Sequence, residues 1–407
     1  MANNNDKKVL NVPALRFPEF SGEWEKYVLT EFVERVTRRN KGNECKLPLT
    51  ISAQYGLVDQ ITFFNKIIAS DDMSNYYLLT NGDFAYNKSY SSEYPWGAIK
   101  RLDRYEYGAL SSLYICFRPL NHVSSDFLTH YFETKKWHQG ISEIAVEGAR
   151  NHGLLNIGIQ DFFATKHYLP QSILEQEKIA CFLNLIEERI RLQNKIIEKY
   201  ESLIQAIIYQ KKTDGIRKGN WQKTELSKVL QERTEKNING YTVCSVSVSQ
   251  GIINQIEYLG RSFAAKKTSH YNVVKYGDIV YTKSPTGDFP YGIVKRSYIK
   301  NAVAVSPLYG VYKPIDDNIG VILHFYFMQP NNAFNYLHPL IQKGAKNTIN
   351  ITNTRFLENS IPLPKTEDEA VYIANALTRI QTKIDIEKSL LRSYEREKQY
   401  LLRQMFI

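Results

Sequence analysis

Apolar positions along the chain follow two different spacings, and the change of spacing divides the chain into four parts. From Ile173 to Tyr209 they recur in heptads, on one line through Ile179, Ile186, Tyr200 and Ile207 and on a second through Leu183, Ile190, Ile197 and Ile204. From Ala370 to Met405 the scheme returns, on lines through Ile373, Ile380, Tyr394 and Leu401 and through Leu377, Ile384 and Leu391. This pattern predicts two long coiled-coil helices, each of about 40 residues and roughly 60 Å.

The parts that precede the two helices have a shorter apolar period. Stretches such as YTVCSVSVSQGIIN and YNVVKYGDIVYTKS alternate apolar and polar residues between Gly, Asn and Ser, which predicts strands and turns. The stretches FLTHYFET and ILHFYFMQ favour helices. Each part is therefore predicted to be a mixed α/β or mostly-β globular domain, whose topology the sequence leaves open.

The second half of the chain repeats the first. Trp24–Asn40 aligns with Trp221–Asn237 at an offset of 197, and Asn81–Ser89 aligns with Tyr276–Ser284 at an offset of 195. The same offset of 195 relates Tyr94–Arg101 to Phe289–Arg296, and GARN at 148–151 matches GAKN at 344–347. A near-constant offset across unrelated patterns indicates two equivalent units of about 195 residues.

Each long helix must bury its apolar stripe, and its own repeat is the natural partner. An antiparallel pair carries the chain to the second domain and back, whereas a parallel pair would need a long return that the short connection Lys211–Asn220 does not supply. We expect Gln193 and Glu387, at the centres of the heptad runs, to meet and fix the register. The predicted fold is α+β: two tandem mixed α/β domains separated by two long helices that form an antiparallel coiled coil, with pseudo-two-fold symmetry. The C-terminus is expected to return to the first domain.

The predicted boundaries are 1–13 for a flexible N-terminal arm, 14–171 for the first domain, 172–212 for the first helix, 213–365 for the second domain and 366–407 for the second helix. The predicted core of the helix pair consists of Ile179, Leu183, Ile186, Ile190, Gln193, Ile197, Ile204, Ile373, Leu377, Ile380, Ile384, Glu387 and Leu391.

Composition narrows the classes of function. The formal net charge of +10 suits a polyanionic partner. The four cysteines stand alone in the sequence, which argues against a zinc site or a disulfide framework and favours a reducing cytoplasm. No apolar run approaches the roughly 18 residues of a membrane span, and the N-terminus has no apolar region typical of a secretory signal.

Motifs for catalysis are lacking in the sequence. It contains no GxxxxGK[ST] phosphate loop, no GxGxxG opening a helix and no Asn/Asp-Pro-Pro-aromatic motif of amino-methyltransferases. Asp126, Glu133 and Lys135 approach the D…ExK spacing of nucleases, but the second half does not repeat it. An enzyme with a hidden nuclease or methyltransferase site is therefore an alternative that only activity can test.

Two different domains on a symmetric frame suit a ligand with two different sites at a fixed separation. Duplex DNA presents its groove again every turn, about 34–36 Å, and two-fold proteins read half-sites at that spacing. Here NECKLPLTISAQYGLVDQ and INGYTVCSVSVSQGIINQ share only a skeleton. We therefore predict that the two domains read different half-sites of a split, asymmetric target.

The opening VPALRFPEFSGEW, the repeated GDxxYxKS and the runs SILEQEKIACFLNLIEERI and EDEAVYIANALTRIQTKI make the chain resemble the specificity subunit of type I restriction–modification systems. The resemblance covers nearly the whole chain. It implies two target-recognition domains that bind double-stranded DNA, and two helical spacers that set their distance and dock two methylation subunits. Restriction and translocase subunits would join this core. It also implies that this chain is not catalytic, because S-adenosylmethionine, ATP and Mg²⁺ belong to the partner subunits.

Candidate phosphate contacts lie where the two halves agree, because phosphate contact carries no sequence information. These are Tyr86, Asn87, Lys88, Ser89, Arg150 and Asn151 in the first half, and Tyr281, Thr282, Lys283, Ser284, Lys346 and Asn347 in the second. Candidate base readers lie where the halves differ. These are Gln54, Tyr55, His138 and Gln139, and then Gln250, Lys266, Lys267 and His270. Trp24 and Trp221 open the two repeats and are predicted to pack in the core.

Two other interpretations fit the sequence. The chain could be a scaffold protein whose coiled coil is the functional part and whose globular domains bind proteins. It could also be the specificity chain of a related, type II-like system in which cleavage and methylation are fused, since that difference lies in the partners.

Overall fold

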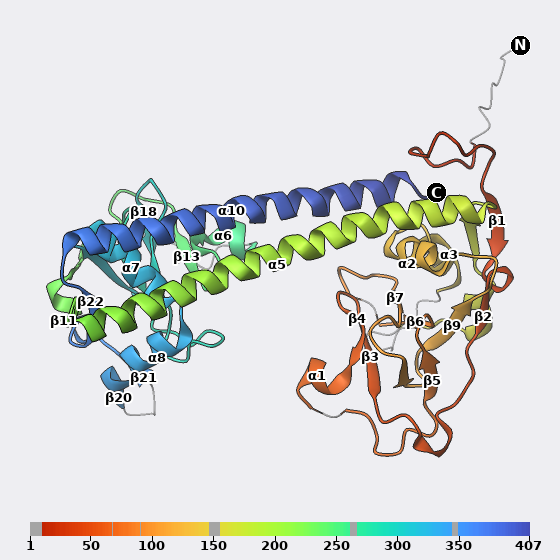
Figure 1. The fold of residues 1–407 in the computed structure, drawn as a ribbon, viewed down its shortest axis with the longest axis horizontal. Helices are drawn as coiled ribbons and strands as arrows, with labels where there is room; N and C mark the ends of the chain where they lie inside the picture. Colours follow the sequence, from red (N-terminus) through yellow and green to blue (C-terminus); the bar gives the residue numbers. More distant parts are fainter. Residues whose placement is uncertain (1–9, 67, 90, 146–154, 261–266, 344–348) are drawn as a thin grey trace, which may run out of the picture. The chain divides into compact units, whose positions relative to one another are not determined.

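The computed structural model describes residues 10–66, 68–89, 91–145, 155–260, 267–343 and 349–407. Its contacts divide the chain into two compact units (Figure 1): unit 1 is Met1–Leu192 with Leu391–Ile407, and unit 2 is Gln193–Leu390. Two long helices, α5 (Ile173–Lys218) and α10 (Glu367–Gln404), contribute one part to each unit. In the part of the chain that the structure describes, no helix is long and apolar enough to span a membrane.

The globular part of unit 1 contains two four-stranded sheets and one antiparallel pair, β1 with β10. One sheet has the order β2-β9-β6-β7, and the other has the order β4-β3-β8-β5 with β3 parallel to β8. The strands are β1 (Glu25–Val28), β2 (Val33–Arg35), β3 (Pro48–Ser52), β4 (Gly56–Asp59), β5 (Tyr77–Thr80), β6 (Phe84–Asn87), β7 (Ala98–Arg101), β8 (Tyr107–Leu110), β9 (Ile115–Pro119) and β10 (Lys166–Leu169). The helices are α1 (Gln60–Phe64), α2 (Ser125–Glu133), α3 (His138–Ile144) and α4 (Ile159–Phe163).

The main core of unit 1 lies between its β2-β9-β6-β7 sheet and the long helices. Helix α2 lies in this space (Figure 1), and its Phe132 packs against Phe84 and Phe117 of the sheet, with ring centres 5.9 and 5.8 Å away. Phe127 and Tyr131 of α2 belong to the same buried cluster, which includes Leu183 of α5. An amphipathic helix and the inner face of a sheet each have one apolar side, so packing them together removes both from water.

Unit 2 repeats this topology. Its inner sheet has the order β12-β19-β16-β17, β11 pairs with β22, and the pairs β13-β14 and β15-β18 stand where unit 1 has its second sheet. The strands are β11 (Trp221–Glu225), β12 (Leu230–Glu232), β13 (Cys244–Ser247), β14 (Gly251–Asn254), β15 (Asn272–Val274), β16 (Ile279–Tyr281), β17 (Val294–Arg296), β18 (Val303–Val305), β19 (Gly310–Pro314), β20 (Gln342–Lys343), β21 (Ile349–Asn350) and β22 (Ser360–Pro364). The helices are α6 (Gln255–Leu259), α7 (Asp317–Phe327), α8 (Pro330–Leu337) and α9 (Asn353–Phe356). The duplication read from the sequence is therefore a duplication of structure.

The two long helices run antiparallel in both units, as predicted. In unit 1, Lys398 donates to Glu187 (2.6 Å). In unit 2, Gln193 Nε2 donates to the Glu387 carboxylate (2.5 Å), so the predicted polar pair meets in the seam. Farther along unit 2, the ammonium of Lys211 lies 4.9 Å from the ring centre of Tyr372. Partner numbers fall along α10 as they rise along α5, which only an antiparallel pair produces.

The seam of the pair is apolar around that polar contact. Buried at this seam are Ile179, Leu183, Ile186, Ile197, Ile204, Ile373, Leu377 and Ile384, while Ile190, Ile380, Glu387 and Leu391 are partly exposed. Residues at the other heptad positions remain mostly exposed, as a narrow coiled-coil stripe requires.

Each unit is anchored by the tryptophan that opens its repeat. Trp24 donates its indole N–H to Glu175 (3.2 Å) at the start of α5, and Trp221 donates to Glu369 (3.0 Å) at the start of α10. Both are buried, which confirms that they are packing residues. Gly215 lies against Trp221, where a Cβ would approach the indole to 2.0 Å. Helix α5 extends through this glycine to Lys218, beyond the predicted end at residue 212.

The end of the chain returns to unit 1, as expected. Phe406 packs against Trp24, Phe127 and Tyr131, with ring centres 6.3, 5.2 and 6.1 Å away. The predicted flexible arm, residues 1–13, includes residues that belong to the folded domain. The Asn11 carbonyl accepts from the Trp24 backbone N–H (2.7 Å), and Pro13 is buried.

Candidate nucleic-acid interface

The repeated Gly-Asp pair is a turn that holds an arginine. The Asp83 carboxylate accepts from the Thr80 backbone (2.8 Å) and from both Nε and Nη2 of Arg118 (3.0 and 3.1 Å). In unit 2, Asp278 accepts from the Lys275 backbone (2.7 Å) and from Nε and Nη2 of Arg233 (2.6 and 2.9 Å). Both carboxylates are buried. The motif therefore fixes the turn before β6 and β16 through paired, charge-assisted hydrogen bonds.

The tyrosines of the repeated motif belong to the core, which corrects their prediction as phosphate contacts. Tyr86 and Tyr281 are 0% and 1% exposed, and their hydroxyls donate to the carbonyls of Trp96 (2.9 Å) and Tyr291 (2.8 Å). Burial raises the pKa of both phenols, so they stay neutral. A buried phenol that satisfies its own hydrogen bond has no surface to offer a ligand.

Thr282 is also buried, and its prediction as a phosphate contact is wrong for the same reason. Its hydroxyl accepts from the Ile293 backbone (3.1 Å), across the β16–β17 hairpin. Gly97 and Gly292 explain the second repeated motif: both have positive φ, and a Cβ would lie 2.1 Å from the Asn87 carbonyl or 2.8 Å from the Lys283 nitrogen. Most of the sequence identity between the halves therefore serves this hairpin.

The remaining residues of the two motifs leave polar groups at the ends of β6 and β16. Lys88 is half-buried and Ser89 is exposed, while the Asn87 side chain accepts from the Ser89 backbone (2.9 Å). Lys283 is half-buried in a left-handed conformation (φ 59°), and Ser284 is exposed. Burial lowers the pKa of Lys283, and the nearby Glu232 carboxylate opposes that effect. Both lysines thus remain candidates for phosphate contact.

The predicted contacts Arg150, Asn151, Lys266, Lys346 and Asn347 lie outside the described residues. Their predictions stay open.

The best-exposed candidate base readers lie on a hairpin and short helix that both units contain. Gln54 and Tyr55 form the turn between β3 and β4 and are exposed. Gln250 occupies the position of Tyr55 in the turn between β13 and β14, at an offset of 195, and is exposed too. Phe63 and Phe64 on α1, next to Tyr55, were not predicted as functional residues. Two adjacent phenylalanines directly before Asn65 and Lys66 were the available signal in the sequence.

The other predicted base readers are spread over each domain. His138 begins α3, is half-buried against Trp137, and its pKa is lowered to about 4, first by burial and then by Lys135. Gln139 is exposed and donates to Glu143 (3.2 Å). In unit 2, Lys267 and His270 are exposed. Among the residues that the structure describes, no hydrogen bond, ion pair or ring contact joins these groups to the hairpin turns.

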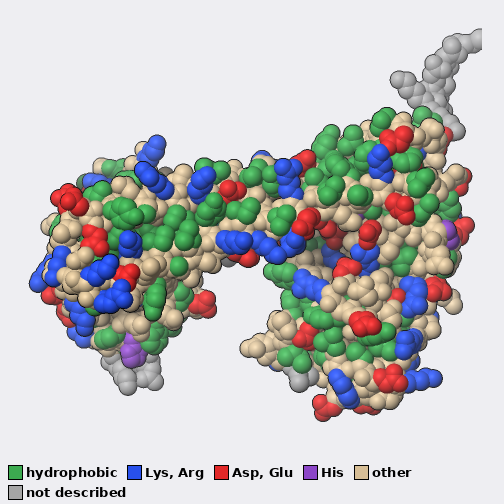
Figure 2. Space-filling model, in the orientation of Figure 1, with side chains coloured by type: hydrophobic (Ala, Val, Ile, Leu, Met, Phe, Trp, Pro, Cys, Tyr) green, Lys and Arg blue, Asp and Glu red, His purple; other side chains and the backbone are tan. Residues whose placement is uncertain are grey.

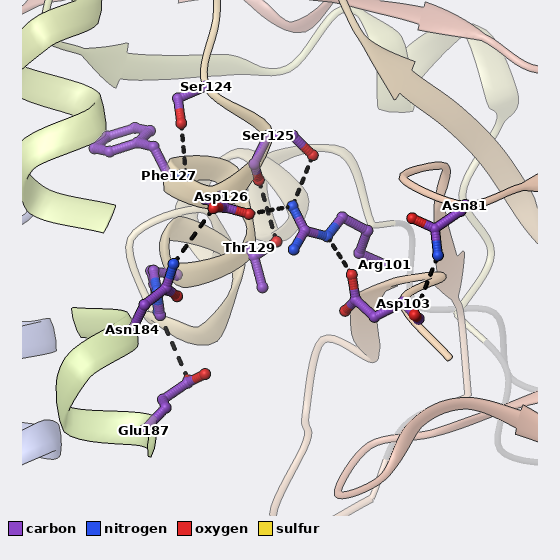
Figure 3. Close-up of polar contacts among 11 residues, drawn as sticks. Asn81, Arg101, Asp103, Ser124, Ser125, Asp126, Phe127, Thr129, Asn184 and Glu187 are labelled. Atoms are coloured by element: carbon purple, nitrogen blue, oxygen red, sulfur yellow. Dashed lines mark hydrogen bonds and ion pairs between the residues drawn. The ribbon is translucent and has the colours of Figure 1, made fainter. Parts of the chain in front are cut away.

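The acidic residues that resemble a nuclease motif are bound to other side chains, and Figure 3 shows the contacts of Asp126. Asp126 accepts from Arg101 (2.7 Å) and from Asn184 of α5 (3.3 Å), and Asn184 in turn accepts from His130 Nε2 (2.7 Å). Glu133 pairs with Lys100. No group of three or more His, Cys, Asp or Glu among the residues that the structure describes could hold a metal ion. The arrangement therefore ties β7, α2 and α5 together.

Net charge is divided unequally between the units. Unit 2 contains 26 Lys and Arg against 17 Asp and Glu, whereas unit 1 contains 26 against 25. On the face in Figure 2, cations on unit 1 alternate with acidic side chains, and cations are more prominent on unit 2. The long-range attraction of a polyanion therefore acts mainly on unit 2.

The long helices expose apolar side chains away from their seam. Leu192 and Ile196 of α5 are 47% and 40% exposed, and at an offset of 194 Ile386 and Leu390 of α10 are 56% and 38% exposed. Hydrophobic side chains also reach the surface of the helix pair in Figure 2. Exposed apolar residues repeated at equivalent positions suit equivalent partners.

No protein-family model and no curated protein matches the sequence. Among solved structures, the chain is similar to the S subunit of a type I restriction–modification system from M. genitalium, at 13% identity and a TM-score of 0.57, over 97% of this chain and 99% of that one. It is also similar, at TM-scores of 0.49 and 0.39, to a chain from a structural study of complex assembly and conformational transition in the type I R-M system and to the HsdS subunit from Thermoanaerobacter tengcongensis. Those two share 15% and 16% identity, and they cover 94% of this chain and 97% and 96% of their own. The first similarity confirms, at the level of the fold, the resemblance to type I specificity subunits.

Proposed function

We propose that this chain is the DNA-specificity subunit of a type I restriction–modification enzyme. The observation that carries the proposal is the full-length similarity of fold to the M. genitalium S subunit. The two similar but non-identical domains and the antiparallel helices give it further support. Each domain reads one half of an asymmetric, bipartite site, and the helices set the distance between the halves.

The helices also dock two copies of a methylation subunit. Leu192 and Ile196 form one docking element and Ile386 and Leu390 form the other, because identical partners require repeated surfaces. Methylation, cleavage and the binding of S-adenosylmethionine, ATP and Mg²⁺ occur on partner subunits. This chain supplies recognition alone.

Mapping methylated adenines in the source genome tests the function directly. A split sequence with two defined halves is expected, and its loss on deletion of the gene for this chain assigns it. Replacing residues 14–171 by the corresponding domain of a related chain should change one half only, because each domain reads its own half. A change in both halves, or methylation unaffected by the deletion, would refute the proposal. A scaffold protein would leave the pattern unaltered.

Two double variants test the docking. One carries Ile386→Asp and Leu390→Asp, and the other carries the equivalent changes Leu192→Asp and Ile196→Asp. Each pair should remove one of two methylation subunits, since charge in an apolar interface is unfavourable. The mass of the purified complex measures the number bound, and Tyr209→Asp, an exposed residue elsewhere on α5, is the control.

A further inference from the structure

An exposed aromatic cluster stands at the hairpin of unit 1. The ring centres of Tyr55 and Phe63 are 6.3 Å apart, and those of Phe63 and Phe64 are 4.8 Å apart. The three side chains are 57%, 43% and 40% exposed. A contiguous group of large apolar side chains in water marks a surface that contacts another molecule.

Hydrogen bonds hold the cluster on a fixed frame. Asp59 caps α1 by accepting from the backbone of Ile61 (3.0 Å) and of Thr62 (3.2 Å). The Ser52 hydroxyl accepts from the Tyr55 backbone (3.1 Å), which closes the turn. Caps and turns of this kind order the backbone before a ligand arrives, so that contact by the rings costs little further ordering.

Unit 2 contains the same frame with different residues at its tip. Asn254 caps α6 at the Ile256 backbone (2.9 Å), and Ser247 accepts from the Gln250 backbone (3.4 Å), at an offset of 195 from Asp59 and Ser52. The tip residue, however, changes from Tyr55 to Gln250. A frame that is kept while its tip changes is what two readers of different sequences need.

The identity of the partner follows from that asymmetry and from charge. Two identical methylation subunits would contact the same residues in both units, whereas Tyr55, Phe63 and Phe64 correspond to Gln250, Tyr258 and Leu259 in unit 2. The two halves of an asymmetric DNA site differ in sequence, so the residues that contact their bases are expected to differ between the units. Unit 1 is also nearly neutral, so net charge adds little long-range attraction there, and apolar contacts with bases would supply affinity that net charge does not.

We propose that Tyr55, Phe63 and Phe64 form an apolar specificity element that contacts bases of the first half-site in duplex DNA. This inference rests on the proposed function and deepens it. Aromatic and aliphatic side chains contact thymine methyl groups in the major groove or insert between base steps, and both contacts depend on sequence. Because they displace no counterions, they contribute the same factor at every salt concentration.

The test uses the full chain in complex with its methylation subunits and a labelled duplex carrying the mapped split sequence. Phe63→Ala with Phe64→Ala should weaken binding by roughly 10- to 100-fold, the range measured for lost base contacts. Discrimination against changes in the first half-site should fall, while that for the second half-site and the salt slope stay as in wild type. Leu113→Ala, which truncates a 73% exposed side chain elsewhere in unit 1, is the control and should change nothing.

Two results would overturn the inference. One is wild-type affinity and wild-type discrimination in the double variant. The other is an equal loss of discrimination at both half-sites, which would indicate a general defect. If the wild-type complex itself does not prefer the mapped duplex, the proposed function fails, and that outcome is distinct from both.

Discussion

The two units share a strand order, yet they support it with different side chains. Both bury an Asp at the turn before the central hairpin, but its arginine comes from β9 in unit 1, as Arg118, and from the segment after β12 in unit 2, as Arg233. In the second strand of that hairpin, Lys100 of β7 has Glu133 as its partner, whereas Lys295 of β17 is buried and burial lowers its pKa to about 8. The comparison teaches that duplication preserved backbone geometry and left individual ion pairs free to change.

The largest expected difference concerns the two turn carboxylates. Asp278→Ala should destabilise unit 2 by about 3–5 kcal/mol, because it leaves the largely buried Arg233 without its partner. Asp83→Ala should destabilise unit 1 by about 1–3 kcal/mol, because water can solvate the charge of Arg118. The loss should be greater in unit 2, since the side chain of Arg233 is 16% exposed and that of Arg118 is 40% exposed. Hydrogen exchange of β16 and β6 in the full chain measures the two effects separately. Equal, small losses would mean that the turns do not depend on these pairs.

The stability of each unit at acid pH should depend on a different buried histidine. Burial lowers the pKa of His324 to about 3 and that of His167 to about 4. Below pH 6.5 the unfolded chain binds protons that the folded chain refuses, so the free energy of unfolding falls as the pH drops from 6.5 toward 3–4. The loss approaches about 3 kcal/mol for each group. His324→Gln should flatten this pH dependence in unit 2 only, and His167→Gln in unit 1 only, by hydrogen exchange; an effect on both units would contradict independent burial.

Lys295 should make unit 2 respond to alkali as well. Its folded pKa of about 8 lies below its ordinary value of 10.5, so the unfolded chain holds the extra proton in that window and stability rises with pH between 8 and 10.5. Lys295→Met should stabilise unit 2 by about 2 kcal/mol at pH 7 and remove that rise. Lys100→Met, which breaks the pair with Glu133, is the matched control and should not stabilise unit 1. Measurements from pH 7 to 9 keep the ionisation of exposed tyrosines small.

The smallest expected effect concerns phosphate contact. Lys88→Ala and Lys283→Ala should each weaken DNA binding for all sequences and reduce the slope of log affinity against log salt by about one. Because the net charge lies mostly in unit 2, the total slope should fall further on neutralising exposed lysines of unit 2 than of unit 1. Unchanged slopes in salt titrations of both variants would remove these lysines from the interface.

The sequence predicted the helices and the duplication because those depend on periodicity. A heptad pattern such as Ile179, Leu183 and Ile186 predicts a helix that buries this stripe against another helix, and these residues are buried. The topology of the sheets could not be predicted, since strand order depends on long-range pairing such as β2 with β9 that no local pattern encodes.

The predictions of phosphate contacts were less accurate than those of the fold, and Tyr86 and Tyr281 show why. An aromatic residue with a hydroxyl suits a core and a DNA surface equally, and only the position of the Trp96 or Tyr291 carbonyl decides between them. Repetition between the halves marked folding constraints instead of phosphate contacts. Tyr55 and Gln250, which differ within a shared frame, are exposed, and their contact with bases stays a prediction.

The return of the chain to unit 1 has a consequence during synthesis. Leu401, Leu402, Met405 and Phe406 belong to the core of unit 1, although most of that unit precedes residue 193. At translation rates of about 5–20 residues per second, the first domain therefore waits roughly 10–40 s with Trp24 and Phe127 uncovered. Unit 2, built from one continuous stretch, can close first although it emerges later. A ribosome that stops between residues 390 and 401 would release a chain whose second unit is complete and whose first unit lacks part of its aromatic core.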